Sequence, residues 1–401
     1  MGNSQHWIDR GLAHVANTYG RYPLVATSGE GCWLTDIDGK KYLDFLAGVA
    51  VNNLGHCHPK VVAALQDQAG RLMHCSNYFH IPQQIELAEI LCEHSFGDRV
   101  FFCNSGAEAN EAALKLVRKY STDNYGNDRF EIITAQNSFH GRTLATVSAT
   151  GQEKIQAGFA PMMPGFKYVP FGDIQAIRAA ISPNTCAIML EPIQGEGGIN
   201  IPPEGYLKAV RELCDQQKLL LVFDEIQVGL GRTGKLFAYQ HDNIEPDVMT
   251  LAKALAAGPP IGAMIAREKY AVALGPGTHG STFGGNPLLA AAGVAAMKVL
   301  LADSILDNCV AMGDYLRTKL EQLQDKYPFI SHVRGRGLIF GMELTIDGAG
   351  IVKTALERGL LINCTVGKVL RFVPPLIVTR KEIDQMLIIL DEIFSELGTG
   401  E

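Results

Sequence analysis

Short apolar runs separated by longer amphipathic stretches fill the middle of the chain, from about residue 58 to residue 305. The run Leu219–Phe223 is apolar at every position, a pattern that favours a parallel strand buried on both faces. Such runs alternate with helical segments, which predicts a mainly parallel sheet wrapped by helices. The predicted strands are Arg99–Cys103, Phe130–Thr134, Lys167–Val169, Cys186–Glu191, Leu219–Phe223, Val248–Leu251 and Gly262–Ala266.

The two ends of the chain show a different pattern. Before residue 50, a short helix and two strand-like runs around the Asp38-Gly39 turn predict a hairpin within Cys32–Phe45. After residue 306, a long helix precedes further strands, and Thr379–Glu382 opens the last helix with a capping-box pattern. The other elements predicted there are strands near Ile330–Val333, Gly337–Leu344, Leu360–Asn363 and Leu370–Val373 and a helix near Ala349–Arg358.

These patterns predict an α/β fold with two domains. Residues 58–305 form the large domain with the mainly parallel sheet. The N-terminal segment, residues 1–57, joins the C-terminal residues 306–401 in a smaller α+β domain.

Composition and charge exclude several classes of protein. The 401 residues, 47% of them apolar, can build a substantial core. The net charge of −7 is mixed along the chain without a Lys/Arg block, so we expect no nucleic-acid or membrane partner. Apolar stretches are far shorter than the ~20 residues that span a bilayer. Nine cysteines without paired spacing favour reduced thiols, and we expect a cytoplasmic protein.

Two charged residues stand where ordinary surface charges do not belong. Asp224 follows the buried run Leu219–Phe223, and ligands of open α/β sheets bind just beyond the carboxyl ends of the strands. Lys253 precedes the almost uncharged run Ala254–Ala266, where burial lowers the pKa of an amine and frees it for Schiff-base chemistry. A carboxylate facing a lysine-bound pyridinium nitrogen is typical of pyridoxal phosphate sites. Singly they fit a solvated lysine and a capping aspartate; together they indicate such a site.

The segment Asn104–Asn110 follows the predicted strand Arg99–Cys103 and opens a helix. Free N–H groups and the helix dipole make such a turn a phosphate cradle, in which Gly106 permits close approach. The alternative is a plain capping box of Ser105 with Glu108, which the turn alone slightly favours.

An aromatic residue and two arginines are candidates for ligand contacts. Phe139, after a predicted strand, can stack on a flat cofactor ring, although an aromatic there is more often part of the core. Arg142 can bind a carboxylate through two parallel hydrogen bonds. Arg371 lies inside an apolar strand, where an unpaired charge is costly, so it needs an anionic partner, either a substrate or Glu196.

Three further motifs also have structural explanations. Ser281 and Thr282 lie in a glycine-rich loop, which alone is a flexible turn but beside a phosphate cradle is a candidate clamp. Gly229–Gly234 matches GxGxxG, but it begins several residues after a strand and no helical pattern follows, so we reject a dinucleotide site. His56-Cys57-His58 has no second ligand pair at metal-site spacing, so no metal site is predicted.

Taken in order, these motifs make the chain resemble the class III pyridoxal-phosphate aminotransferases over essentially its full length. The resemblance implies a fold type I enzyme that binds pyridoxal 5′-phosphate and forms a homodimer with its site at the subunit interface. The matching segments are Asn17–Pro23, Leu54–Pro59, Asn104–Asn110, Phe139–Arg142, Glu191–Gly198, Asp224–Gln227, Thr250–Lys253 and Gly280–Pro287.

By resemblance, most of the candidate residues would contact the cofactor. Lys253 would bind its aldehyde carbon and later shuttle a proton between the substrate Cα and the cofactor C4′. Asp224 would keep the pyridine nitrogen protonated, and Phe139 would stack on the ring. The other cofactor contacts would come from Ser105, Gly106, Ala107, Glu225, Ile226 and Gln227 and, from the partner chain, Thr282.

The resemblance also implies how amino-acid and 2-oxo-acid substrates are held. Arg142 would bind the carboxylate remote from the reacting amine, and Arg371 the α-carboxylate of glutamate, with Ser281 near the substrate. Glu196 would pair with Arg371 when the other substrate brings only one carboxylate. The first matching segment favours N²-acetyl-L-ornithine over ornithine as that substrate, with 2-oxoglutarate as the amino acceptor.

Two departures from the family pattern carry consequences. Ala107 stands where the family usually has threonine, which removes one hydroxyl from the phosphate and lowers the expected cofactor affinity. After Lys253, alanines at 254, 256 and 257 replace glycines that the family often shows there, which bears on the mobility of this loop.

Several other functions stay open on the sequence alone. Succinylornithine, N-succinyl-diaminopimelate, 4-aminobutyrate and ornithine are competing amino donors. An aminomutase using the same cofactor would need no 2-oxoglutarate. A non-catalytic protein that kept the fold is disfavoured, because Lys253, Asp224 and both arginines are present.

Overall fold

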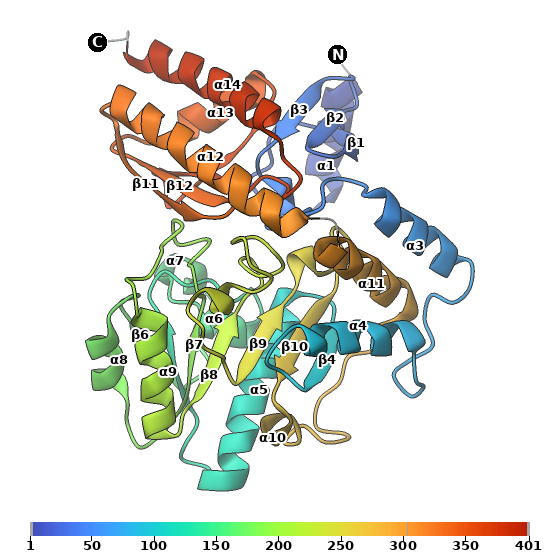
Figure 1. Ribbon diagram of the computed structural model, residues 1–401, viewed down its shortest axis with the longest axis vertical. Helices are drawn as coiled ribbons and strands as arrows, with labels where there is room; N and C mark the ends of the chain where they lie inside the picture. Colours follow the sequence, from blue (N-terminus) through green and yellow to red (C-terminus); the bar gives the residue numbers. More distant parts are fainter. Residues whose placement is uncertain (1–2, 303, 399–401) are drawn as a thin grey trace.

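A seven-stranded sheet forms the centre of the larger part of the molecule (Figure 1). The computed structural model describes residues 3–302 and 304–398; residues 1–2, 303 and 399–401, which the domain prediction includes, lie outside them. The strand order is β4-β10-β9-β8-β7-β5-β6. These strands are β4 (Arg99–Cys103), β5 (Glu131–Ala135), β6 (Phe166–Val169), β7 (Thr185–Leu190), β8 (Leu220–Asp224), β9 (Val248–Leu251) and β10 (Gly262–Ala266).

The seven predicted strands are all present, and most run parallel. Strand β8 pairs in parallel with β7 and β9, and β5 pairs in parallel with β6 and β7. Strand β10 is the exception, because it runs antiparallel to both β9 and β4. Only residues 252–261 connect β9 to β10, fewer than the roughly dozen that a parallel crossover needs, so the chain must turn back.

Both faces of this sheet are covered, as the all-apolar strands require. Leu220 and Val222 of β8 pack in a cluster with α5 (Gly106–Tyr125), whereas Leu221 and Phe223 face the opposite cluster. That second cluster includes residues of α4 (Pro82–Glu93), α9 (Tyr206–Gln217) and α11 (Pro287–Ala302). The remaining helices of this part are α3 (Pro59–Ala69), α6 (Leu144–Ala149), α7 (Glu153–Gln156), α8 (Ile174–Ala180), α10 (Glu268–Ala271) and the 3-10 turns η1 (Ala238–His241) and η2 (Lys253–Ala256).

Segments from both chain ends form the smaller part, above the large sheet in Figure 1. Its sheets have the orders β1-β2-β3-β13 and β11-β12-β15-β14, and β3 pairs in parallel with β13. This pairing supports the prediction that residues 1–57 join the C-terminal domain, whose boundaries stay a prediction. The elements are α1 (Asn3–His14), β1 (Ala26–Glu30), β2 (Trp33–Asp36), β3 (Lys41–Asp44), α2 (Ala47–Ala50), α12 (Ile305–Lys326), β11 (Ile330–Arg336), β12 (Ile339–Leu344), α13 (Ala349–Glu357), β13 (Leu360–Leu361), β14 (Asn363–Thr365), β15 (Val369–Phe372) and α14 (Arg380–Gly398).

Two local predictions have clear outcomes here. The hairpin is confirmed, since β2 and β3 pair in an antiparallel register around the Asp38-Gly39 turn. The single strand predicted over Leu360–Asn363 is wrong, because it breaks at Ile362 into β13 and β14, which belong to different sheets. The capping glutamate of α14 is present: the N–H and hydroxyl of Thr379 donate to Glu382 Oε2 at 2.8 and 2.9 Å.

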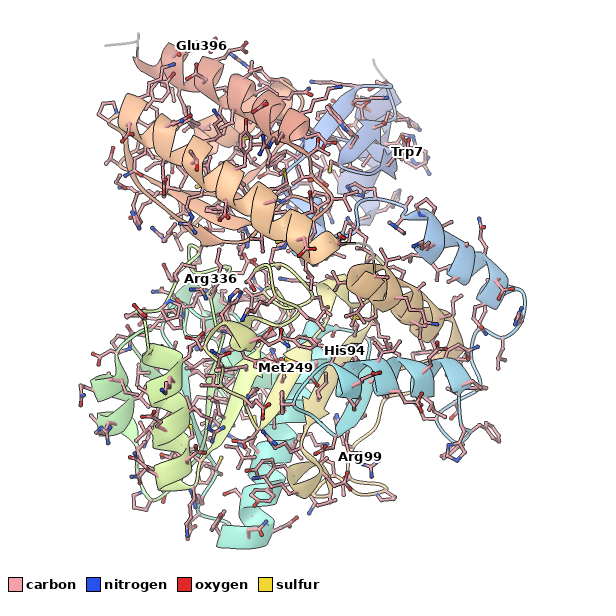
Figure 2. The ribbon with its side chains drawn as sticks, in the orientation of Figure 1. Trp7, His94, Arg99, Met249, Arg336 and Glu396 are labelled. Atoms are coloured by element: carbon pink, nitrogen blue, oxygen red, sulfur yellow. The ribbon has the colours of Figure 1, made fainter. Side chains whose placement is uncertain are left out.

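The two parts meet along the edge of the large sheet. Met249 of β9 lies in the packed interior, while Arg336, at the end of β11, lies where the upper and lower parts come together (Figure 2). Among the described residues, no single helix combines the length and apolarity needed to cross a membrane. Helices α11 and α12 have that length and apolarity only when they are taken together, and a bend of 65° separates them.

Candidate active site

A cavity of about 400 Å³ lies at the carboxyl ends of the central strands. The segments after β4, β5, β7, β8 and β9 all reach it, which is the place where open α/β sheets bind ligands. Ten of the residues predicted for the site line this one cavity, although they come from five separate segments. They are Ser105, Gly106, Ala107, Phe139, Arg142, Glu196, Asp224, Ile226, Gln227 and Lys253.

Lys253 stands immediately after β9, in a strained backbone conformation. Its φ is 42°, in the left-handed region that residues with side chains rarely adopt and that clusters at functional sites. Within the described residues, its amine forms no hydrogen bond or ion pair. Burial lowers the pKa of this amine and outweighs the opposing effect of the Glu196 carboxylate. A lysine in this state is a better nucleophile and proton carrier at neutral pH.

The Asp224 carboxylate is buried and held from three sides. Asn110 Nδ2 donates to Oδ2 at 2.8 Å, His140 Nδ1 lies 2.8 Å from the same oxygen, and the Ile226 N–H donates to Oδ1 at 3.1 Å. Burial alone would lower the pKa of His140, but the neighbouring Asp224 raises it above its usual value. These contacts fix the orientation of the carboxylate within the cavity.

Asn110 and His140 contact Asp224, and neither was predicted from the sequence to belong to the site. Asn110 Nδ2 also donates to the His140 carbonyl at 2.7 Å, and its Oδ1 accepts from Thr250 at 2.7 Å. Both residues lie inside predicted motifs. Asn110 is separated from Asp224 by 114 residues in the sequence, and His140 by 84. No local pattern signals such a pairing.

The first turn of α5 supplies donors for an anion. The capping box is present, since Ser105 Oγ accepts from the Glu108 N–H at 3.2 Å and Glu108 accepts from the Asn104 N–H at 2.7 Å. Within the described residues, the N–H groups of Gly106 and Ala107 have no acceptor. The capping box and the phosphate cradle are therefore compatible, because the box leaves two donors at the positive end of a long helix.

Gly106 is required for a reason different from the one expected. A Cβ atom on this residue would lie 2.8 Å from Ile226 Cδ1, closer than real contacts allow. The glycine therefore lets the start of α5 pack against the turn that follows Asp224, which brings the anion donors and the carboxylate to one cavity.

Arg371, from the small part of the molecule, contacts two residues that line the cavity. It is 1% exposed, and its Nη1 donates to Glu196 Oε1 at 2.5 Å and to Gln227 Oε1 at 3.2 Å. Burial raises the pKa of Glu196, but Arg371 and Lys253 outweigh it and lower that pKa to about 2. The anionic partner that Arg371 requires is thus Glu196, within the protein itself.

Comparison with known proteins decides the family. The family model for class-III aminotransferases matches residues 14–394. Acetylornithine aminotransferase of Methanocaldococcus jannaschii is 53% identical over 98% of this chain and 99% of its own. The solved acetylornithine aminotransferase of Elizabethkingia anophelis has a TM-score of 0.89 at 34% identity, covering 99% and 100% of the two chains. The chain belongs to the class-III aminotransferases.

A further structure bears on the cofactor. The ornithine aminotransferase of Toxoplasma gondii, with a TM-score of 0.95 and 39% identity, covers 98% of this chain and 95% of its own. Its structure shows pyridoxal phosphate at partial occupancy in the active site. Class-III aminotransferases depend on this cofactor, and the fold here is their fold type I architecture.

The cavity of this aminotransferase fits that cofactor. It has free N–H donors for a phosphate in α5, a buried carboxylate for a ring nitrogen, and an amine of lowered pKa. Phe139, half-buried, lines the same space for ring stacking. These are the groups that such a ring, with its phosphate and aldehyde, requires.

Besides Arg371, three of the predicted site residues are absent from the lining of this cavity. Glu225 points away from it: its buried carboxylate accepts the N–H groups of Ala238 and Tyr239 at 2.6 and 2.8 Å, and burial raises its pKa to about 8. Its side chain therefore does not contact a ligand there, contrary to the prediction. Ser281 accepts from Asn104 Nδ2 at 3.2 Å outside the cavity, and Thr282 is exposed.

Outside the cavity, the rejected motifs have structural roles. The Gly229–Gly234 segment is a loop followed only by the short 3-10 turn η1, as expected for a motif that binds no dinucleotide. His56 Nε2 lies 2.7 Å from Asp44 Oδ2. Among the described residues, no group of three or more His, Cys, Asp or Glu side chains could hold a metal ion.

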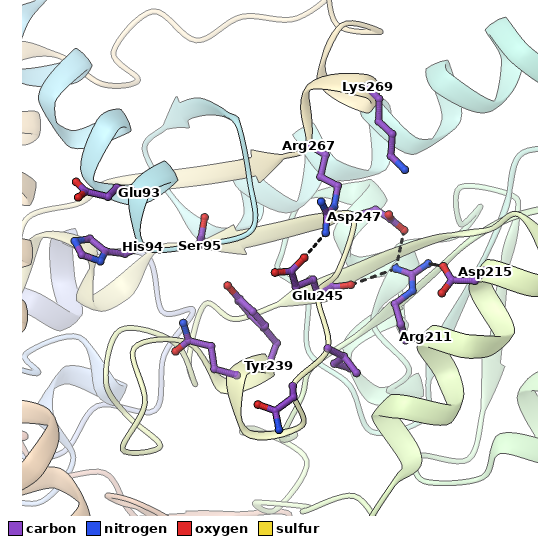
Figure 3. A pocket seen from close by; sticks show the side chains of 13 residues that line it. Glu93, His94, Ser95, Arg211, Asp215, Tyr239, Glu245, Asp247, Arg267 and Lys269 are labelled. Carbon is purple, nitrogen blue, oxygen red and sulfur yellow. Dashed lines mark hydrogen bonds and ion pairs between the residues drawn. The ribbon is translucent and has the colours of Figure 1, made fainter.

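A second, more open cavity of about 880 Å³ lies at the opposite edge of the sheet, where β9 begins (Figure 3). In it, Arg211 pairs with Asp247 at 2.9 Å and with Asp215 at 2.7 Å, and Arg267 pairs with Glu245. Its two arginines already have anionic partners, whereas Arg142 forms no ion pair within the described residues.

The Glu196 pairing predicts a specific loss of stability in acid. Its folded pKa of about 2 lies below the unfolded value of 4.5, so it contributes stability that is present above pH 4.5 and lost as the pH falls towards 2. We expect Glu196→Gln to lower the melting temperature most above pH 4.5, and wild type and variant to converge towards pH 2. Differential scanning fluorimetry at pH 7, 4.5 and 3 measures this; a difference independent of pH would contradict it.

Proposed function

We propose that this aminotransferase moves the distal amino group of N²-acetyl-L-ornithine to 2-oxoglutarate. The products are N-acetylglutamate 5-semialdehyde and glutamate, so the enzyme serves arginine biosynthesis. The observation that carries the proposal is the pairing of the buried Arg371 with Glu196, beside an unpaired Arg142. The names of the curated relatives support the same amino donor.

The two arginines allow one site to bind two substrates that differ in their number of carboxylates. Glutamate and 2-oxoglutarate carry two carboxylates, whereas N²-acetyl-L-ornithine reacts at its distal amine and brings only one. Arg142 is placed to bind the remote carboxylate of either substrate. Arg371 binds the α-carboxylate of glutamate only when that group displaces Glu196, and otherwise Glu196 keeps the guanidinium neutralised. A buried arginine without either partner would be costly.

Pyridoxal phosphate, when bound, supplies an electron sink conjugated to the reacting carbon of the substrate. Gly106 and Ala107 would hold its phosphate, Phe139 its ring face and Lys253 its aldehyde carbon. Asp224, held in place by its donors, would hold the proton on the pyridine nitrogen. Lys253, with its lowered pKa, would carry the proton to and from the substrate carbon that bears the reacting amine.

We propose that the enzyme is a homodimer and that Thr282 reaches the partner's cofactor phosphate. Thr282 is exposed and lies outside its own cavity. Its loop is tied to a second exposed segment, since Asn77 Nδ2 donates to the Ser281 carbonyl at 3.0 Å. Tyr78, Phe79 and Phe283 are 93%, 67% and 59% exposed, an apolar patch that a second copy would cover. Light scattering at micromolar concentration tests this; a monomer would contradict it.

We further propose a cytoplasmic location and small-molecule amino-acid and 2-oxo-acid partners. All nine cysteines are free, which fits a reducing compartment. The positive charges of Arg142 and Arg371 fit carboxylate substrates.

The amino donor is tested by half-reactions of the cofactor-loaded enzyme with each candidate amine. We expect N²-acetyl-L-ornithine to bleach the visible absorbance at least ~10-fold more efficiently than ornithine, succinylornithine or 4-aminobutyrate. Glutamate serves as the positive control, since it is the common second substrate. The assignment fails if 4-aminobutyrate or ornithine reacts as fast as the acetylated amine.

A further inference from the structure

Arg232 is, with Arg371, one of the two largest side chains that are fully buried in the described part of the chain. It belongs to the Gly229–Gly234 loop. Its Nη1 donates to the carbonyls of Leu338 at 2.8 Å and Pro374 at 2.5 Å, and its Nη2 donates to Asn53 Oδ1. Each of the three acceptors is uncharged.

Folding stability alone does not explain why a charged guanidinium is buried here. Burial lowers its pKa to about 10, so it stays protonated at neutral pH, and within the described residues it forms no ion pair. Its Nε is buried without a hydrogen-bond partner. Apolar side chains in place of a buried charge are often neutral or stabilising, so the arrangement points to a role in geometry.

Two of the three acceptors, and Arg232 itself, belong to segments that each bring a residue to the active site. Asn53 lies two positions after Val51, which lines the cavity. Pro374 lies three positions after Arg371, and Arg232 itself lies five positions after Gln227. One planar guanidinium therefore joins the N-terminal segment, the end of β15 and the turn that follows β8.

Backbone contacts make this junction rigid. The Leu338 N–H donates to the Arg232 carbonyl at 3.0 Å, and Asn53 Nδ2 donates to the Leu230 carbonyl at 2.8 Å. Gly337 has a φ of 58°, and a Cβ atom there would lie 2.5 Å from the Thr233 carbonyl carbon. The Gly229–Gly234 loop and the turn at Gly337 therefore touch backbone to backbone. The Arg232 guanidinium donates to the Leu338 carbonyl beside that turn, and it thereby fixes the separation of the two segments.

We propose that Arg232 is a positioning residue that holds Arg371 in register with Gln227 and Glu196. It thereby sets the affinity for the α-carboxylate of glutamate and 2-oxoglutarate. A shift of about 1 Å in a carboxylate clamp is enough to weaken substrate binding strongly. Lys253 and Asp224 are held by the strands of the large sheet, so cofactor binding does not depend on this junction. The inference rests on the proposed function for its choice of substrates.

The test uses Arg232→Met, Arg232→Lys and the matched control Arg211→Met, all as cofactor-loaded enzyme. Arg211 is also largely buried, but it forms ion pairs and lies at the opposite edge of the sheet (Figure 3). For Arg232→Met we expect the KM for glutamate and 2-oxoglutarate to rise ~10-fold or more, against less than ~3-fold for the amino donor. Arg232→Lys, which keeps the charge but not the planar fork, should fall between.

A purely structural role would give a different result. The inference is overturned if Arg232→Met raises the KM of both substrates equally, or lowers only thermal stability as Arg211→Met is expected to do. The visible spectrum of the loaded variant should match wild type, and loss of the cofactor would also overturn it.

Two further measurements separate this proposal from misfolding and from a wrong choice of amino donor. If Arg232→Met does not fold, Asn53→Ala removes one arm of the junction and should raise the glutamate KM in the same direction by a smaller factor. If wild type reacts with glutamate but not with N²-acetyl-L-ornithine, the proposed donor fails while the glutamate KM still tests Arg232.

Discussion

Replacing Lys253 by alanine is expected to abolish transamination and to remove the visible absorbance of the bound cofactor. Lys253 is the one lysine that lines the cavity among the described residues, so no other amine there can bind the aldehyde carbon or carry the proton of the reacting carbon. Loss of a positioned proton carrier alone costs about 10²–10⁴ in rate. Because Lys253 has both tasks, we expect turnover to fall by at least ~10⁴-fold, measured with N²-acetyl-L-ornithine and 2-oxoglutarate.

The control for this variant is Lys319→Ala on α12, far from the cavity. Lys319 bonds only to Gln322 and lies over the Tyr315 ring at the surface, so its loss should leave rate and spectrum unchanged. Lys253→Ala should stay folded, because the substitution removes no hydrogen bond among the described residues. Alanine at φ 42° has about the same backbone strain as lysine, so that strain does not change. Appreciable turnover by a well-folded Lys253→Ala would refute the catalytic assignment.

Local pattern was sufficient to predict the elements of the large sheet and the position of its site. An uninterrupted apolar run such as β8 has to be buried on both faces, and a charge at its end has to meet a ligand or a partner. Asp224 and Lys253 could therefore be found without knowing what lies beside them. The direction of β10 followed from the length of the preceding connection, a consequence that strand pattern alone did not reveal.

Contacts between distant residues could not be predicted in the same way. His140 and Asn110 hold Asp224 only because β4, β5, β8 and β9 end at one edge, where three loops converge. Glu225 follows Asp224 directly, yet its side chain turns away to accept two N–H groups of η1. Adjacent residues at a strand end point in opposite directions, and which one faces the ligand depends on the register of the whole sheet.

The glycine pattern of the Gly229–Gly234 loop is compatible with close contact either to a dinucleotide or to another part of the protein. Its glycines do allow close approach, as in a dinucleotide site, but the partner is the protein itself. A Cβ atom on Gly231, whose φ is 90°, would lie 2.9 Å from Leu306 and Leu376. The same close packing buries Arg232, so the motif connects the two parts of the molecule.

Asp224→Asn is expected to lower kcat by about 10²–10³ while leaving the protein folded. At ~4 Å and an effective dielectric of ~20, a carboxylate stabilises a pyridinium proton by about 4 kcal/mol, and each 1.36 kcal/mol corresponds to a tenfold change in rate. That value is an upper limit, because the amide oxygen can still accept from Asn110 and His140, and only the charge facing the ring is lost. Asp247→Asn is the matched control: its carboxylate is also buried and accepts the Leu221 N–H at 2.8 Å, but at the opposite edge of the sheet. It should lower the melting temperature without lowering kcat, and equal kcat values for the two variants would show that the charge of Asp224 does not act on the reaction.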